Sequence, residues 1–216
     1  MTGEGVRGRL RREVVVRAAL TLLDEVGIDG LTTRRLAREL GVQSPALYWH
    51  VKNKRELLDL MAAAMHADTF AGERAPRDVP WTRWLAEDAQ AKRRALLSHR
   101  DGARVEAGSR PTPAQLPGLE AQLQALCAAG FTPRDALRAC LAVDRYTMGW
   151  VLEEQAATAD AGHGAHPQYP DEVFADLPLL AQGAAVLRQD DPDADFDYGL
   201  RVLIAGIEAA LEAPAP

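Results

Sequence analysis

The sequence has little of what a membrane-spanning or secreted protein needs. Its 216 residues contain no run of about 18 uninterrupted apolar residues, and the N-terminal segment MTGEGVRGRLRRE lacks the apolar stretch of a secretory signal. Only two cysteines are present, Cys127 and Cys140, and each lies in an apolar helical pattern. We therefore expect free, buried thiols in a reducing compartment rather than a disulfide or a metal pair. These absences predict a cytoplasmic protein with no membrane partner.

Aromatic residues are also scarce, at 6%, while hydrophobic residues make up 47% and charged residues 26%. This balance is typical of a globular chain that buries a sizeable core. The sequence shows no G-x-S-x-G, H-E-x-x-H, Walker or dinucleotide-binding motif, and His163 and His166 lie in a Gly/Pro-rich segment. An enzyme that uses the histidines and the many carboxylates is therefore only an alternative.

The net charge of −6 hides a split along the chain. Residues 1–55 carry 11 basic and 6 acidic side chains, a net charge of +5, which leaves a net charge of −11 for residues 56–216. A basic N-terminal module on an acidic body is typical of a protein that brings one end to a polyanion. A chance fluctuation is the alternative explanation of the charge split alone.

Short helices with capping residues are predicted in the basic part. Apolar spacing predicts a helix over about residues 10–26 that Gly27 ends. Thr32 is expected to cap a two-turn helix that ends at Gly41, and Ser44 to cap a helix over residues 45–50 that has Pro45 at its first position. Two short helices joined by a glycine-containing turn predict a helix-turn-helix, whose second helix is shaped to enter the DNA major groove.

The rest of the chain is predicted to be helical too, and no segment has the pattern of a strand. Thr132 is expected to cap the longest helix, and residues 158–171 to form a loop. The fold class predicted by these patterns is all-α. The expected helices cover residues 55–70, 81–99, 118–129, 133–157, 177–187 and 196–211.

The stretch GIDGLTTRRLARELGVQSPALYWHVKNKRELLD closely resembles the DNA-binding domain of the tetracycline repressor family. The segments LLSHRDGARVEAGSRPT, LEAQL, CAAGF and GWVLEEQ extend the resemblance over roughly the whole chain, and they are similar to the tetracycline repressors themselves rather than to the family at large. The resemblance implies an all-α homodimer of nine or ten helices. It implies a helix-turn-helix DNA-binding domain over residues 1–52 and a ligand-binding and dimerisation domain over residues 53–216, with the helix at about 54–70 as the connector.

The resemblance also implies which residues face operator DNA. Arg34 is suited to donate two hydrogen bonds to a guanine, and Lys54 to anchor a phosphate. Ser44 and Ala46 stand where the tetracycline repressors have Gln and Thr, so we expect a different operator sequence. Trp49 either contacts DNA or packs against the following helix. The full set is Thr33, Arg34, Ser44, Pro45, Ala46, Tyr48, Trp49, His50 and Lys54.

For the ligand site, the matched positions both agree with and depart from the family. Phe70 and Asp88 replace a His and an Asn that hold tetracycline, Lys92 replaces a stacking Phe, and Glu106 replaces a magnesium-binding His. An exposed ion pair between Asp88 and Lys92 is an alternative role for those two residues. The implied ligand-binding residues are Phe70, Asp88, Lys92, Glu106, Ser109, Arg110, Pro111, Leu116, Leu119, Gln122, Leu137 and Glu153.

These departures change the ligand that we expect. They allow magnesium only together with a chelating ligand, with Glu106 and Glu153 as its oxygen donors. Without such a cation, we expect the two carboxylates to repel each other and one of them to hold a proton. Tetracycline with magnesium is expected to be a poor inducer, and a different fused-ring aromatic or polyketide-like molecule to be favoured.

Dimerisation is expected through two apolar stripes, although intramolecular packing is the alternative for both. The predicted function is a repressor that binds a palindromic operator as a homodimer and is released by a small polycyclic inducer, controlling an efflux gene for antibiotic resistance. A transcriptional activator, or a regulator without a small-molecule ligand, is the alternative function. The stripes are Leu141, Val143, Tyr146, Met148 and Val151 on the long helix, and Leu200, Leu203, Ile204 and Ile207 on the last helix.

Overall fold

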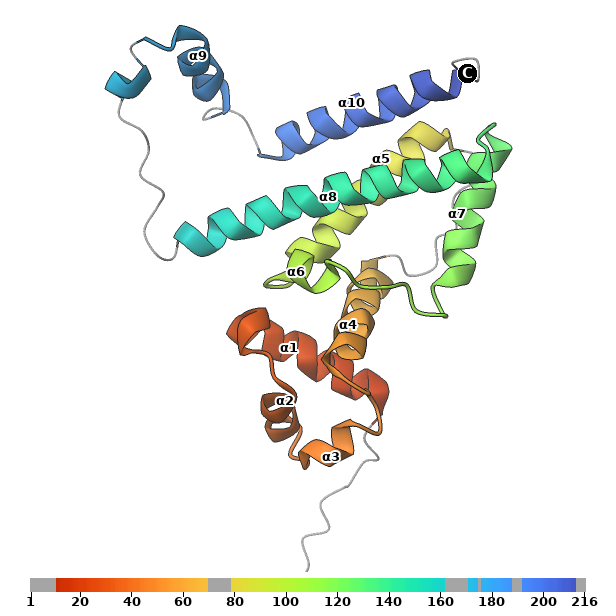
Figure 1. Ribbon diagram of the computed structural model, residues 1–216, viewed down its shortest axis with the longest axis vertical. Helices are drawn as coiled ribbons and strands as arrows, with labels where there is room; N and C mark the ends of the chain where they lie inside the picture. Colours follow the sequence, from red (N-terminus) through yellow and green to blue (C-terminus); the bar gives the residue numbers. More distant parts are fainter. Residues whose placement is uncertain (1–10, 70–78, 162–170, 175, 188–191, 213–216) are drawn as a thin grey trace, which may run out of the picture. The chain divides into compact units, whose positions relative to one another are not determined.

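The computed structural model describes residues 11–69, 79–161, 171–174, 176–187 and 192–212. These residues form ten α-helices and one 3-10 helix, with no strand among them (Figure 1). The all-α fold class is therefore confirmed. Of the helices in these ranges, none is both long and apolar enough to cross a membrane. The chain divides into two compact units, the first made of residues 1–74 and 91–120 and the second of residues 75–90 and 121–216.

The first unit begins with the predicted helix-turn-helix. Gly27 has a φ of 69° and interrupts α1, as the sequence predicts, but one further helical turn follows it. A five-residue helix, α6, was not predicted, because so short a segment shows no helical period. The helices of this unit are α1 (Arg12–Gly30), α2 (Thr33–Glu39), α3 (Ser44–Leu47), α4 (Lys54–Thr69), the C-terminal part of α5 (Trp81–Leu97), and α6 (Gly102–Glu106).

The predicted caps of α2 and α3 have different outcomes. Thr32 caps α2 as expected, because its Oγ1 accepts a hydrogen bond from the backbone N–H of Arg35 at 3.2 Å. The prediction that Ser44 caps α3 is wrong. Gln43, whose backbone is extended, holds the capping position without a side-chain hydrogen bond, and α3 begins at Ser44. Pro45 still lies in the first turn, where its missing N–H costs nothing.

A small apolar core holds α1 to α4 together. Leu22 and Leu23 of α1 are buried with Leu36 of α2 and Leu47 of α3. Leu40, directly after α2, is half-buried. Burying a side chain of this size contributes about 1.5 to 3 kcal/mol, so this core fixes the positions of the short helices.

The second unit contains the rest of the helices. Its core is formed by α5, α7, α8 and α10. The ring of Phe196 is stacked on that of Tyr146, with 5.4 Å between the ring centroids, and is in edge contact with that of Trp150, with 5.8 Å between the centroids. Thr132 caps α8 as predicted, since its Oγ1 accepts from the backbone N–H of Asp135. The helices are the N-terminal part of α5, α7 (Leu116–Ala128, which begins in the first unit), α8 (Pro133–Ala161), α9 (Pro178–Leu187) and α10 (Pro192–Glu212), with the 3-10 helix η1 (Asp171–Phe174).

The two apolar stripes expected at a dimer interface lie mostly inside this core. Val143 and Val151 of α8 and Leu200 and Ile204 of α10 are at most 6% exposed. The stripes therefore hold α8 and α10 together within one chain, which was the alternative explanation. Only Leu141 of the predicted set counts as exposed, at 37%.

Both cysteines are free thiols in the second unit, as expected, although each is half-buried rather than fully buried. Burial raises the pKa of the Cys140 thiol to about 11, with the carboxylates of Asp88 and Asp144 acting in the same direction. Because the thiolate is the reactive form, Cys140 is a structural residue and a poor nucleophile.

Candidate functional site

The surface of α2 and α3 presents the residues predicted to face DNA. Trp49 is 88% exposed and Tyr48 is 53% exposed, directly after α3. Trp49 therefore does not pack against α4, which removes that alternative. Thr33, Ser44, Ala46 and His50 are half-buried, and Arg34, Pro45 and Lys54 are exposed. Exposed aromatic side chains cost free energy in water, so their position beside a basic helix indicates a binding surface.

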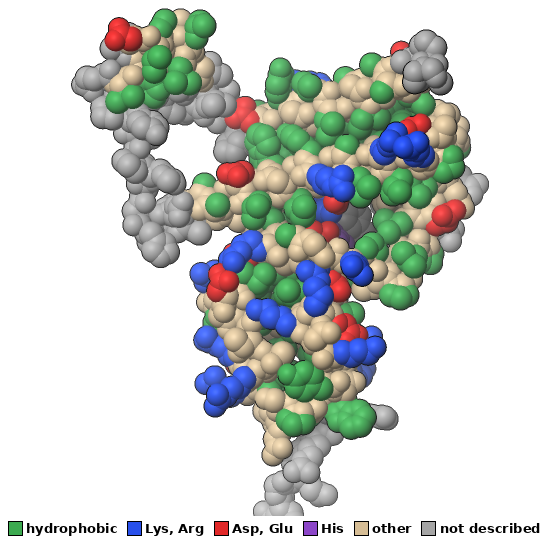
Figure 2. All heavy atoms as spheres, in the orientation of Figure 1, with side chains coloured by type: hydrophobic (Ala, Val, Ile, Leu, Met, Phe, Trp, Pro, Cys, Tyr) green, Lys and Arg blue, Asp and Glu red, His purple; other side chains and the backbone are tan. Residues whose placement is uncertain are grey.

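Arginines dominate the exposed face of α2. Arg34, Arg35 and Arg38 are exposed and form no ion pair with any residue in the described ranges. Arg34 and Arg38 line an open hollow together with Gln43 and Ser44 at the start of α3. Figure 2 shows Lys and Arg side chains spread over the visible face of this unit. Guanidinium groups without an internal partner are available to a polyanion.

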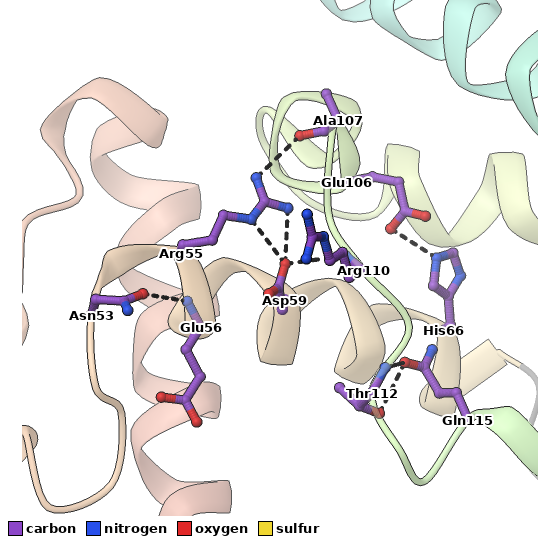
Figure 3. Close-up of polar contacts among 10 residues, drawn as sticks. All are labelled: Asn53, Arg55, Glu56, Asp59, His66, Glu106, Ala107, Arg110, Thr112 and Gln115. Carbon is purple, nitrogen blue, oxygen red and sulfur yellow. Dashed lines mark hydrogen bonds and ion pairs between the residues drawn. The ribbon is translucent and has the colours of Figure 1, made fainter.

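Hydrogen bonds between side chains and the backbone fix the ends of the helix-turn-helix. The Nε of Arg12 on α1 donates to the carbonyl of His50 at 3.1 Å. Asn53 caps α4, since its Oδ1 accepts from the backbone N–H of Glu56 at 2.9 Å (Figure 3). Lys54 donates to the carbonyl of Ile28 at 3.3 Å, which ties α4 to the end of α1. Lys54 is exposed, so this bond leaves it accessible.

Three ionisable side chains meet elsewhere in the first unit. The Nζ of Lys92 on α5 donates to Oε1 of Glu106 at 3.1 Å, and the Nε2 of His66 on α4 lies 3.0 Å from Oε2 of the same carboxylate. Figure 3 shows His66 and Glu106 pointing toward each other from α4 and α6. Their side chains are only 11 to 15% exposed. We call these three residues the buried triad.

The neighbours of Glu106 fix its charge state. Burial alone would raise the pKa of Glu106, but the hydrogen bond from His66 and the charge of Lys92 outweigh it and lower the pKa from 4.5 to about 2. Glu106 is therefore ionised near neutral pH and does not hold a proton. The alternative role for Lys92 in an exposed ion pair is excluded, because its side chain is only 11% exposed.

Sequence reasoning missed His66. It follows Met65 near the end of an apolar helical stretch, and a lone histidine there does not reveal its partner. Only the fold places it opposite Glu106, 40 residues further along the chain.

The other predicted ligand residues are distributed over both units. Phe70 lies outside the described residues. In the first unit, Ser109 is half-buried and Arg110, Pro111, Leu116 and Leu119 are exposed. In the second unit, Asp88 and Gln122 are half-buried, and Leu137 and Glu153 are exposed on α8. That these residues form one ligand site therefore stays a prediction.

The start of α6 is bonded to the end of α1. The Oδ2 of Asp101 accepts from the backbone N–H of Ile28 at 2.8 Å, and Arg104 binds Asp29 through both terminal nitrogens at 2.9 and 3.0 Å. His99 lies 2.9 Å from a carboxylate oxygen of Asp24. We call these contacts the α1–α6 latch. Asp101 has a φ of 57°, a conformation unfavourable for most side chains, which the latch holds in place.

The end of α6 is joined to α4. Arg55 bridges Asp59 of α4 and the carbonyl of Ala107, and the backbone N–H of Arg110 donates to Asp59 at 3.2 Å (Figure 3). Because His66 also comes from α4, three contacts link α4 to residues 106–110. Residues 101–110, which include α6, therefore connect the buried triad to α1 and α4, and α4 carries Lys54 of the DNA-facing set.

The buried triad does not fit a magnesium ion. Both carboxylate oxygens of Glu106 are engaged by nitrogen donors, one of them an ammonium group. Magnesium prefers a near-octahedral shell of oxygens and is repelled by a cation within a few ångströms. Among the described residues there is also no group of three or more His, Cys, Asp or Glu that could hold a metal ion. Glu106 is therefore a poor magnesium ligand in this arrangement.

Comparison with known proteins gives matches along nearly the whole chain. Residues 15–61 match the bacterial regulatory proteins of the tetR family, and residues 75–211 match the tetracyclin repressor-like C-terminal domain. The chain is 46% identical over 200 residues to the tetracycline repressor protein class C of Escherichia coli, covering 93% of this chain and 91% of that protein.

Solved structures agree with these matches. TetR from Acinetobacter baumannii AYE is 45% identical with a TM-score of 0.75, covering 94% of this chain and 98% of that one. TetR class A in complex with 5a,6-anhydrotetracycline and magnesium is 40% identical with a TM-score of 0.69, covering 93% and 99%. These relatives are regulators rather than enzymes, so the enzyme alternative is set aside. The chain belongs to the tetracycline repressor family of DNA-binding transcriptional regulators.

Proposed function

We propose that this regulator is a repressor that binds a palindromic operator as a homodimer and leaves it when a small polycyclic molecule binds the body. The observation that carries the proposal is the set of bonds around α6, which ties the buried triad to α1 and α4 of the basic DNA-facing module. The DNA-binding domain is residues 1–52, and residues 53–216 bind the ligand and the second copy. The repressor acts on bacterial DNA and therefore in the cytoplasm, where it controls an efflux gene for the same class of molecule.

Exposed apolar side chains on α8 and α10 support the homodimer. Leu141 and Leu152 of α8 are 37% and 40% exposed, and Tyr198 and Val202 of α10 are 62% and 54% exposed. Tyr198 and Val202 are four residues apart and so lie on one face of α10. A second copy that covers these residues would bury this apolar surface and place two reading heads on one operator.

Two substitutions separate base reading from phosphate binding. Arg34→Ala is expected to make the free energy of operator binding less favourable by about 1 to 3 kcal/mol and to relax the base preference at one position per half-site. The reason is that it removes a bidentate donor to guanine. Lys54→Ala is expected to weaken binding to all sequences about equally and to reduce the salt dependence, because a phosphate contact carries no base information. Binding measured on a set of single-base operator variants separates the two. Equal weakening of every sequence by Arg34→Ala would show that Arg34 is not a base reader.

Breaking the α1–α6 latch is expected to weaken the coupling between ligand binding and release of DNA. Asp101→Gly permits the same positive φ but loses the hydrogen bond to Ile28 and the contact with Arg104. We expect operator affinity without ligand to stay within about threefold, and the ligand concentration for half-release to rise about fivefold or more, the lower end of typical coupling. The matched control is Arg83→Ala, which removes an exposed ion pair on α5. An unchanged half-release concentration in Asp101→Gly would remove the latch from the mechanism.

Release itself tests the proposed function. The purified protein is bound to a fluorescent duplex from the region upstream of its gene and titrated with polycyclic aromatic compounds. The proposal predicts specific binding that at least one compound reverses, and a reporter gene whose expression rises with that compound. A reporter that falls on release would identify an activator instead.

A further inference from the structure

In the buried triad, two hydrogen-bond donors face one carboxylate of the protein itself, as they would face a bound anion. A carboxylate can only accept hydrogen bonds, so the Nε2 of His66 and the Nζ of Lys92 both act as donors toward Glu106. The donors come from α4 and α5, and the acceptor comes from the last residue of α6. Two donors from long helices thus converge on one acceptor held by a five-residue helix.

The charges of the triad favour a second anion over a cation. Lys92 neutralises Glu106, and His66 adds either no charge or one positive charge. A cation that enters must compete with Lys92 for Glu106 and then lie close to the ammonium group that it displaces. An anion instead takes the position of Glu106 and satisfies both donors, and the Glu106 side chain that it displaces is the most exposed of the three, at 15%.

We infer that the inducer carries a carboxylate or an ionised phenol, and that it binds Lys92 and His66 without a metal ion by displacing Glu106. This inference rests on the proposed function and names the chemical class of its ligand. Displacement releases the end of α6, while the α1–α6 latch carries its movement toward α1. The exchange replaces two charge-assisted hydrogen bonds with two of the same kind, so the polycyclic body supplies the net affinity through apolar contact.

Two probes that differ only in charge test the inference. Anthraquinone-2-carboxylate and anthraquinone-2-carboxamide have the same ring system, and calorimetry measures their binding to the full-length protein without DNA. We expect the carboxylate to bind about tenfold or more tightly than the amide, since charge-assisted hydrogen bonds are about twice as strong as neutral ones. EDTA or added magnesium is expected to leave its affinity unchanged, and tetracycline with magnesium to bind more weakly than the carboxylate.

A paired variant ties the preference to the triad. The double substitution Lys92→Met with Glu106→Gln removes the cation and the carboxylate of this ion pair together and is expected to abolish the preference for the carboxylate. Arg94→Met, an exposed position on the same helix, is the control and is expected to keep it. Failure of the carboxylate to bind, equal affinity for acid and amide, or a requirement for magnesium would overturn the inference. Operator binding is measured separately without ligand, so failure of the proposed repressor function is distinguished from failure of the anion site.

Discussion

Raising the salt concentration from 50 to 200 mM is expected to weaken operator binding by about 10³ to 10⁵-fold, as for a protein that makes about 6 to 10 phosphate contacts. The reason is the positive charge of the two DNA-binding domains. Residues 1–55 carry a net charge of +5 in each chain, and the arginines of α2 are exposed and have no ion-pair partner among the described residues. Binding of two such heads releases counterions from the DNA, and this release becomes unfavourable as salt rises.

Fluorescence anisotropy over a series of KCl concentrations gives the slope of log affinity against log salt. Lys54→Ala is expected to lower that slope by about one for each phosphate contact that is lost. Arg138→Ala is the matched control, because Arg138 is an exposed cation of α8 that pairs with Asp135 in the second unit. A loss of operator affinity below about tenfold between 50 and 200 mM KCl would show that the basic module does not bind the phosphate backbone.

Replacing Glu106 with leucine is expected to lower the free energy of unfolding by about 3 to 5 kcal/mol, because it removes the largely buried carboxylate to which Lys92 and His66 donate hydrogen bonds. Adding Lys92→Met to Glu106→Leu is expected to restore much of the loss, since it removes the ammonium group together with the carboxylate that it faces. Urea unfolding of the single and double variants at pH 7 measures both effects. A cost below about 1 kcal/mol for Glu106→Leu would show that the triad is not a buried, coupled unit.

The same residue gives an acid dependence with a definite sign. The folded-state pKa of Glu106 is about 2, below its ordinary value of 4.5, so the unfolded state takes up a proton first as the pH falls. The stabilisation is fully present above pH 4.5 and is lost between pH 4.5 and 2. It amounts to about 3 kcal/mol by linkage. The stability of Glu106→Leu is expected to fall less steeply over that window.

Local signals predicted most of the fold because they act within a few residues. Thr32 and Thr132 cap their helices through bonds to backbone N–H groups three residues ahead, and Gly27 adopts the positive φ that interrupts α1. Ser44 was misplaced because Gln43 holds the extended position before it. The helix α6 was missed because five residues are too few to show a period, and its conformation depends on bonds to α1.

The site was less predictable, because its geometry depends on partners far away in the sequence. Lys92 has a charged side chain on an amphipathic helix, and sequence alone suggests that it faces water. It is buried beside Glu106, whose other carboxylate oxygen faces His66, 40 residues away from Glu106. The apolar stripes of α8 and α10 show the same limit. A hydrophobic pattern identifies a buried face but not whether the face is covered by the same chain or by another one.

A footprint of the full-length protein on the DNA upstream of its gene, combined with sedimentation of the free protein, tests the central claim most directly. Operator binding by a homodimer predicts a dimer in sedimentation and two symmetric protected half-sites, with centres about 34 to 36 Å apart along the duplex. A monomer in solution that protects a single site without two-fold symmetry would contradict it.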